Sequence, residues 1–199
     1  TGNDMNFSEE DLRMQVREYL IPLWNIYTYL VTYANIHNWI PDPSLAGNKR
    51  KNFDDSHPWD HIPFDDIENE LDEWILVRLE ETIREVTEHL DKYIIPPATR
   101  AIRSYIEDIS KWYIRRSRDR FFEGNKDVMN ILYYVLVETT KLLAPFAPFV
   151  SEYIYRQIVS NESFDVPESV HLTDFPEADT KFISEYEKII EEMSFVRQI

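Results

Sequence analysis

Cysteine is absent from this chain of 199 residues. Without thiolates the protein can form neither a disulfide framework nor a cysteine-ligated zinc site. The absence fits a reducing compartment, and we expect a cytoplasmic location. Glycine is nearly as rare, with 3 residues, whereas hydrophobic residues make up 43% of the chain. This composition is typical of a globular, mainly helical protein and not of a disordered or low-complexity one.

Long apolar runs are missing as well. No stretch approaches the roughly 20 apolar residues that a membrane-spanning helix requires. The N-terminal sequence TGNDMNFSEE has neither the basic nor the apolar region of a secretory signal. We therefore expect a soluble chain without a membrane partner. Because the sequence begins without Met and stops within the helical pattern at SFVRQI, we also expect it to be a piece of a longer protein.

Positive charge is scarce, with 21 Lys and Arg against 37 Asp and Glu, and the formal net charge is −16. An acidic surface repels phosphate, which argues against general affinity for nucleic acids or anionic membranes. The segment 96–126 is the exception, because its eight basic and four acidic residues give it a charge of +4 and leave −20 for the rest. The basic residues are Arg100, Arg103, Lys111, Arg115, Arg116, Arg118, Arg120 and Lys126. Such a local positive stripe indicates one positioned contact with an anion.

Apolar residues recur three or four positions apart through most of the chain, which is the period of an amphipathic helix. The pattern predicts helices over residues 9–35, 68–93, 97–120, 126–143 and 149–159, and a last helix beginning near Asp179. Pro22 should kink the first helix, and Ser8 is expected as its N-cap. Gly124 is a plausible C-cap for the third.

Two segments lack the helical period. Residues 41–66 contain four prolines and should form an irregular connection. The stretch VHLTDFPEAD reads as a short extended segment that ends at Pro176. No alternation of strands and helices is visible, so we predict an all-α fold, an antiparallel helical bundle. We divide it into a helical domain over residues 1–178 and the start of a truncated C-terminal helical extension over residues 179–199.

The basic segment WYIRRSRDRFFEG lies at the end of the third predicted helix. On a regular helix, one arc outside the apolar face carries four cations and should form an exposed cationic stripe, namely Arg100, Lys111, Arg115 and Arg118. Arg116 and Arg120 continue the apolar arc, where we expect their guanidinium groups to reach buried or half-buried carboxylates.

Three interpretations of this stripe remain open from the residues alone. It can be a solvated face with local ion pairs, such as Arg115 with Asp119. It can contact RNA phosphates, with Trp112 stacking on an unpaired base. The chain can also be a helical module that binds partner proteins through an apolar groove. Salt-dependent affinity for RNA distinguishes the second interpretation from the others.

Other candidate sites are weaker. HPWDH supplies His57, Asp60 and His61, but the flanking prolines Pro58 and Pro63 oppose the helix that would bring both histidines to one metal, so we predict no metal site. The basic run KRK at 49–51 is a possible second RNA contact.

Five segments, in order, resemble the helical anticodon-binding domain that follows the catalytic core in class I aminoacyl-tRNA synthetases of the isoleucyl, valyl, leucyl and methionyl group. They are IPLWNIYTYLVTYANI (21–36), LDEWILVRLEE (71–81), YIEDISKWYIRRSRDRFF (105–122), LLAPFAPFVSEYIYRQI (142–158) and ESVHLTDFPEAD (168–179). The YAN after LWN, the SKWYIRRSRDRF block and the SVHLTDFPE tail are most similar to the isoleucyl enzymes, with the valyl enzymes next.

The resemblance implies a parent enzyme that activates isoleucine with ATP and Mg and transfers it to tRNA. Neither catalytic signature of the class, the HIGH tetrapeptide or the KMSKS loop, is present, so this chain should supply no catalytic residue and hold no cofactor or metal. Its implied partners are the isoleucine-specific tRNA and the remaining domains of the same synthetase. The implied RNA-binding residues are Arg100, Lys111, Trp112, Arg115 and Arg118.

Overall fold

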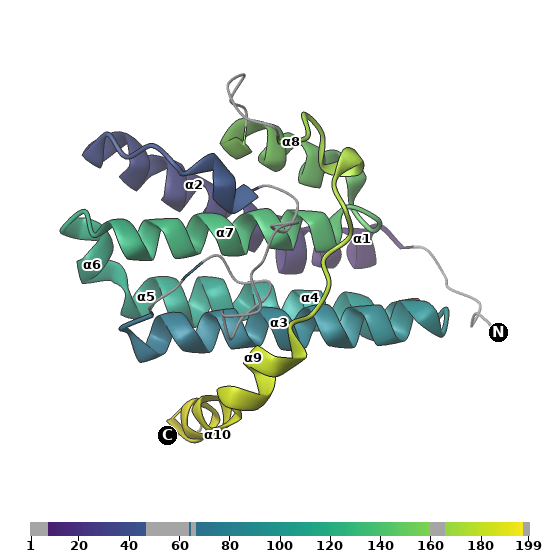
Figure 1. Cartoon of the computed structure of the whole chain (residues 1–199). Helices are drawn as coiled ribbons and strands as arrows, with labels where there is room; N and C mark the ends of the chain where they lie inside the picture. The colour runs from purple at the N-terminus through teal and green to yellow at the C-terminus, as the bar shows by residue number, and fades with distance from the viewer. Residues whose placement is uncertain (1–7, 47–63, 65–66, 160–165, 197–199) are drawn as a thin grey trace.

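The structure is a computed structural model that describes residues 8–46, 64, 67–159 and 166–196 (Figure 1). Within these ranges the chain forms helices and connecting segments and no strand, so the all-α prediction is confirmed. The α-helices are α1 Glu9–Gln15, α2 Ile21–His37, α3 Glu70–Asp91, α4 Ile95–Glu107, α5 Ile114–Arg116, α6 Arg118–Phe122, α7 Lys126–Leu143, α8 Pro148–Val159, α9 Thr180–Glu185 and α10 Glu187–Val196. No helix in the described ranges is both long enough and apolar enough to cross a membrane.

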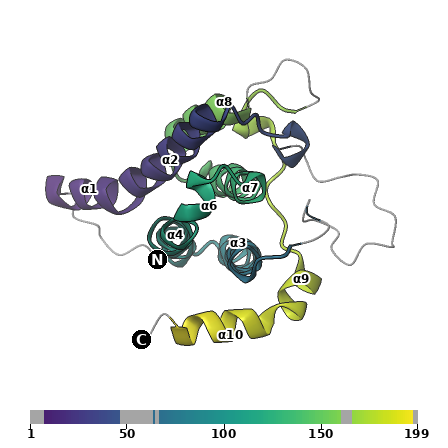
Figure 2. The ribbon, with the colours of Figure 1, turned by 90° about the vertical axis from the view of Figure 1, so that its left-hand side faces the viewer.

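The helix α7 lies at the centre of an antiparallel bundle. Figure 2 shows α2 and α8 on one side of α7 and α3 and α4 on the other, with α10 beyond α3. Consecutive long helices α3, α4 and α7 run in alternating directions (Figure 1). Almost every residue of α7 is buried, because neighbours cover it on both sides.

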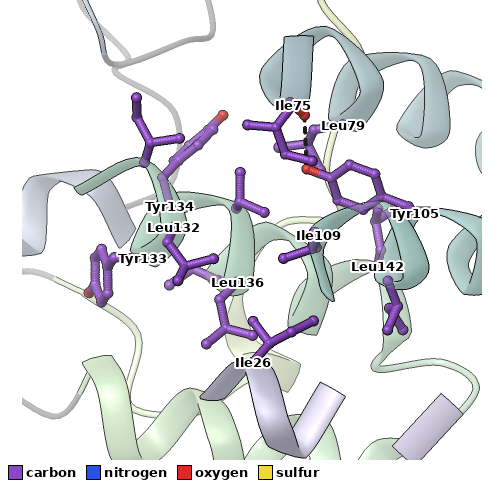
Figure 3. Close-up of a cluster of buried hydrophobic side chains, with 14 of the residues drawn as sticks. Ile26, Ile75, Leu79, Tyr105, Ile109, Leu132, Tyr133, Tyr134, Leu136 and Leu142 are labelled. Atoms are coloured by element: carbon purple, nitrogen blue, oxygen red, sulfur yellow. Dashed lines mark hydrogen bonds between the residues drawn. The ribbon is translucent and has the colours of Figure 1, made fainter. Parts of the chain in front are cut away.

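The core forms where these layers meet (Figure 3). Ile26 of α2 and Ile75 of α3 approach Leu136 of α7 from opposite sides, and all three are at most 1% exposed. The buried hydroxyl of Tyr105 donates a hydrogen bond of 3.0 Å to the carbonyl oxygen of Ile75. Burial raises the pKa of Tyr105, so the hydroxyl stays a donor at neutral pH.

Pro22 interrupts the first predicted helix. A π-helical segment, Val16–Leu20, separates α1 from α2, and Pro22 lies in the first turn of α2. Proline has no N–H, and its ring crowds the carbonyl of the fourth residue before it, so the preceding turn widens. The predicted interruption is therefore confirmed. Ser8, the expected N-cap, directly precedes α1.

The third predicted helix is irregular, whereas the predicted arcs of arginines require a regular helix over residues 97–120. Asp108–Tyr113 is π-helical, and the chain leaves helical geometry at Ser117 before α6 begins. The π segment keeps Asp108, Ile109 and Tyr113 all buried, with the Asp108 carboxylate 3.2 Å from Arg78 Nε. Each π turn inserts one residue, which rotates everything after it by about 100° relative to a regular helix.

Three predictions concern the connections. Gly124 has a φ of 75°, the left-handed conformation expected of a helix C-cap. Residues 41–66 were expected to be irregular, and Pro43–Ala46 forms a 3₁₀ turn, while the ring of Phe64 packs edge-on against Tyr134. The candidates 49–51, His57, Asp60 and His61 lie outside the described residues.

The C-terminal part differs from its prediction in two places. Val170–Leu172 forms a 3₁₀ turn within the segment expected to be extended. The last predicted helix begins where expected, since the Asp179 carboxylate accepts hydrogen bonds from the Lys181 and Phe182 N–H groups, but it breaks at Tyr186 into α9 and α10. Both helices pack on α3. The division between residues 1–178 and 179–199 stays a prediction.

Candidate nucleic-acid interface

The segment that carries the clustered arginines lies at one end of the bundle, where α2 ends and α7 begins (Figure 1). Arg120 anchors it to α3. Its Nη1 and Nη2 atoms lie 2.8 and 2.6 Å from the two carboxylate oxygens of Asp72. The hydroxyl of Tyr113 donates a third hydrogen bond, of 2.7 Å, to Asp72 Oδ1. Asp72 is only 2% exposed, so this carboxylate joins α3 to both ends of the arginine segment.

The ionisation of this cluster is fixed by its surroundings. Hydrogen bonds to Asp72 raise the pKa of Arg120, with burial opposing them. Burial raises the pKa of Tyr113, and the Asp72 charge raises it further. The arginine is therefore always a cation and the tyrosine always a donor near neutral pH, and the guanidinium of Arg120 is committed inside the protein.

Arg115 and Arg118 point to solvent instead. Both are exposed, and no described carboxylate lies within ion-pair distance of either, so the local pair of Arg115 with Asp119 is not formed. Arg118 lies near α2: burial raises the pKa of Tyr29 and the charge of Arg118 opposes the rise. These two guanidinium groups are open to an anion.

Lys111 and Arg100 are placed differently. Lys111 Nζ lies 3.0 Å from Glu107, whose other contact is Arg103 at 3.4 Å, and the Lys111 hydrogen bond is the largest cause of the lowered pKa of Glu107. The side chain of Lys111 is nevertheless 59% exposed. Arg100 is exposed near the start of α4, roughly 25 Å along the helix axis from Arg118. The structure therefore brings together Arg115 and Arg118, and leaves Arg100 apart from them.

The expectation for Arg116 is wrong. Its side chain is exposed, and its guanidinium carbon lies 4.3 Å from the centre of the Trp112 ring. The π-helical segment before it rotates Arg116 away from the apolar arc, so the cation stacks on the half-buried Trp112 instead of entering the core. Arg116 covers one face of this ring, and the stacking of Trp112 on a base stays a prediction.

Sequence reasoning missed how α2 holds this segment. The rings of Tyr29 and Tyr33 lie 5.0 and 5.7 Å from the ring of Phe121. Nε2 of His37 is 3.0 Å from the carbonyl oxygen of Phe121. A β-carbon added to Gly124 would lie 2.7 Å from His37 Nδ1, so only glycine fits against this ring. The regular spacing of Tyr29, Tyr33 and His37 is the one sequence signal that could have indicated the contact.

Known proteins of similar sequence identify the family. The sequence profile described as "Anticodon-binding domain of tRNA ligase" matches residues 72–199. The chain belongs to this family. Isoleucine–tRNA ligases are among the relatives of this tRNA ligase domain. That of Dehalococcoides mccartyi strain CBDB1 is 40% identical over 190 residues, which are 92% of this chain and 17% of the relative. That of Thermus thermophilus is 35% identical over 189 residues, 92% of this chain and 16% of the relative.

The chain spans about a sixth of the length of the curated relatives it matches. A solved structure of the agnB2 LeuRS–tRNA–LeuAMS ternary complex from Agrobacterium radiobacter K84 is 20% identical, with a TM-score of 0.54. It covers 90% of this chain, which corresponds to 18% of that protein. The chain therefore shares its fold with part of that LeuRS.

Proposed function

We propose that this domain binds the anticodon stem and loop of the isoleucine-specific tRNA as part of an isoleucine–tRNA ligase. The observation that carries the proposal is the pair of open cations, Arg115 and Arg118, on a segment fixed to the bundle by Arg120. Membership of the anticodon-binding family and relatives named isoleucine–tRNA ligase support it. The domain contributes binding energy and tRNA orientation, while activation of isoleucine with ATP and Mg belongs to other domains of the parent enzyme, in the cytoplasm.

The charge distribution explains how such a contact works in an acidic protein. Phosphates are repelled by a chain of net charge −16 except where cations stand free of carboxylates. Arg115 and Arg118 meet that condition, and Lys111 adds a charge that Glu107 partly compensates. Contacts to phosphate position the RNA without reading its sequence, so specificity for isoleucine tRNA requires further contacts to bases.

The test uses the full-length protein with Arg115→Glu and Arg118→Glu together. The matched control is Arg84→Glu with Lys92→Glu, two exposed residues of α3 and its C-cap toward the opposite end of the bundle, which change the net charge equally. We expect weaker binding of isoleucine tRNA only in the first variant. Arg115→Ala with Arg118→Ala should reduce the slope of log affinity against log salt by about 1.4, the value for two phosphate contacts.

Aminoacylation assays separate the binding role from catalysis. In the Arg115→Glu, Arg118→Glu variant the KM for tRNA should rise, while isoleucine-dependent ATP–pyrophosphate exchange stays unchanged. If the Arg84→Glu, Lys92→Glu control lost as much affinity for tRNA, the net charge of the protein alone would govern binding, and the assignment of the interface would be wrong. Stronger binding of isoleucine tRNA than of valine tRNA tests the proposed specificity.

A further inference from the structure

A long segment of this chain carries no charge. Residues 19–41 contain no Asp, Glu, Lys or Arg, although charged residues make up 29% of the sequence. Burial explains the charge-free stretch 128–137 of α7, because that helix is enclosed on both sides. It does not explain α2, which lies on the outside of the bundle (Figures 1 and 2).

The outer face of α2 is exposed along its whole length. It presents small neutral polar residues and a few apolar ones, namely Ile21, Trp24, Asn25, Thr28, Thr32, Asn35 and Ile36. The hydroxyls of Thr28 and Thr32 donate to main-chain carbonyls four residues back, at 2.9 and 2.7 Å, which leaves their oxygens able to accept. An ordinary solvated helix face would carry charged residues here.

Aromatic rings of α8 extend this face. The ring of Trp24, 43% exposed, lies 5.5 Å from that of Tyr153, which is 49% exposed. Phe149, one turn earlier in α8, is 91% exposed. Tyr27 packs against Trp24 from within α2 at 5.3 Å. Loss of charge together with exposed aromatic rings is the composition of a binding surface and not of a free one.

The outer face of α2 adjoins the arginine segment, and this position indicates what binds to it. At its C-terminal end α2 contacts Phe121 through Tyr29 and Tyr33, and Arg118 lies beside Tyr29. From Trp24 to Asn35 the face extends roughly 16 Å along the helix. An RNA whose phosphates bind Arg115 and Arg118 therefore meets, on α2, a neighbouring surface without carboxylates in an otherwise acidic protein. Neutral side chains and rings suit bases rather than phosphates.

We propose that the outer face of α2, extended by Tyr153 and Phe149 of α8, receives unpaired bases of the bound tRNA. Trp24, Tyr153 and Phe149 supply ring surfaces for stacking. The carboxamides of Asn25 and Asn35 supply both donors and acceptors for base edges. This inference rests on the proposed function, and it assigns base contacts to α2 and α8 and phosphate contacts to α5 and α6.

The first test uses the full-length protein with Trp24→Ala and Tyr153→Ala together. The probes are isoleucine tRNA and the same tRNA with abasic nucleotides in its anticodon loop. We expect affinity for intact tRNA to fall about 10- to 100-fold, since stacking is lost, while the slope of log affinity against log salt is unchanged. The abasic tRNA should bind the wild-type protein and the variant equally, because it has no bases to stack.

A second variant tests the α2 face while keeping all its aromatic side chains. Thr32→Glu places a carboxylate on the α2 face, and Ser184→Glu is its control, because Ser184 is an exposed helical hydroxyl that also bonds to the main chain. Weaker tRNA binding by Thr32→Glu alone supports the inference. Should Trp24→Ala with Tyr153→Ala and Thr32→Glu bind tRNA as the wild type does while Arg115→Glu with Arg118→Glu binds poorly, the inference is wrong and the proposed function stands.

Two other outcomes are decisive. An equal loss of affinity for intact and abasic tRNA would show that the rings do not contact bases, which overturns the inference. Unchanged tRNA affinity with weakened association of another domain or protein would assign the α2 face to a protein contact, which overturns it as well. Wild-type binding in the arginine variant and both α2 variants would contradict the inference and the proposed function together.

Discussion

Arg118 and Arg120 are two residues apart in α6 and have opposite surroundings. Arg120 makes two hydrogen bonds to a buried carboxylate, whereas Arg118 is exposed and no described carboxylate pairs with it. A separation of two residues places side chains about 200° apart around a helix, so one turn of α6 can face both inward and outward. The inner arginine fixes the backbone that presents the outer one, which lowers the entropy cost of binding an anion there.

The largest expected effect comes from removing the inner partner. Asp72→Ala leaves the guanidinium of Arg120 and the hydroxyl of Tyr113 without their acceptor. Removing one member of a buried ion pair costs about 3–5 kcal/mol of unfolding free energy. Urea denaturation of the chain measures this loss.

The exposed acid of the same segment provides the control for that experiment. Asp119→Ala should change the unfolding free energy by less than about 0.5 kcal/mol. The double variant Asp72→Leu, Arg120→Met should be more stable than Asp72→Ala alone, since no buried charge is left unpaired. If Asp72→Ala were as mild as Asp119→Ala, Arg120 would not anchor the segment.

The contact between α2 and the α6–α7 turn gives the next effect. Gly124→Ala forces a β-carbon into the left-handed region and to within 2.7 Å of His37 Nδ1. We expect a loss of about 2 kcal/mol, of which the conformational part is about 1–2 kcal/mol. Combining it with His37→Ala removes the steric part only. Thermal unfolding of the single and double variants separates the two causes, and additive losses would show that the ring and the β-carbon do not collide.

Helix periodicity predicted much of this fold. The bounds of α7, 126–143, follow from its apolar repeat and the turn residues before it. The predicted inward direction of Arg120 is confirmed, although the π-helical segment and the break at Ser117 that precede it were not predicted. The partner of Arg120 was not predicted, because Asp72 is 48 positions away and is one of many carboxylates in an acidic chain.

Features that depend on irregular helix geometry could not be predicted from the sequence. Apolar spacing does not mark where a helix widens into a π turn, so the rotation that exposes Arg116 was not visible from the residues. The absence of charge from residues 19–41 is plain in the sequence, but its meaning depended on which helices are enclosed. Only the fold shows that α7 is central and α2 is outside.

The buried cluster around Asp72 should make the stability of the protein depend on pH in the alkaline range, whereas the exposed arginines should not. Burial raises the pKa of Tyr113 above its ordinary value near 10, so its contribution to stability is complete below pH ~10 and is lost as pH rises further, because only the unfolded state releases the proton. The slope for one such tyrosine is at most about 1.4 kcal/mol per pH unit.

Urea midpoints measured between about pH 8 and pH 11 test this slope. Above pH ~10, Tyr113→Phe should reduce the slope of unfolding free energy against pH by the contribution of one proton. The variant should be less stable than the wild type at pH 8, because the hydrogen bond to Asp72 is lost. Tyr105→Phe, whose hydroxyl is equally buried, should reduce the slope by a similar amount. An unchanged slope in both variants would mean that these hydroxyls ionise without unfolding.

The smallest effect is expected where an arginine lies on the surface but still has a partner. Arg116→Ala removes the cation from the Trp112 ring, a contact worth about 0.5–1 kcal/mol at an exposed site. It also uncovers one face of the ring. Tryptophan fluorescence should therefore become more accessible to quenching by acrylamide, a neutral quencher, while unfolding free energy falls only slightly. Arg118→Ala should change neither property and should weaken tRNA binding, whereas Arg116→Ala with unaltered quenching would place Arg116 among the open cations with Arg115 and Arg118.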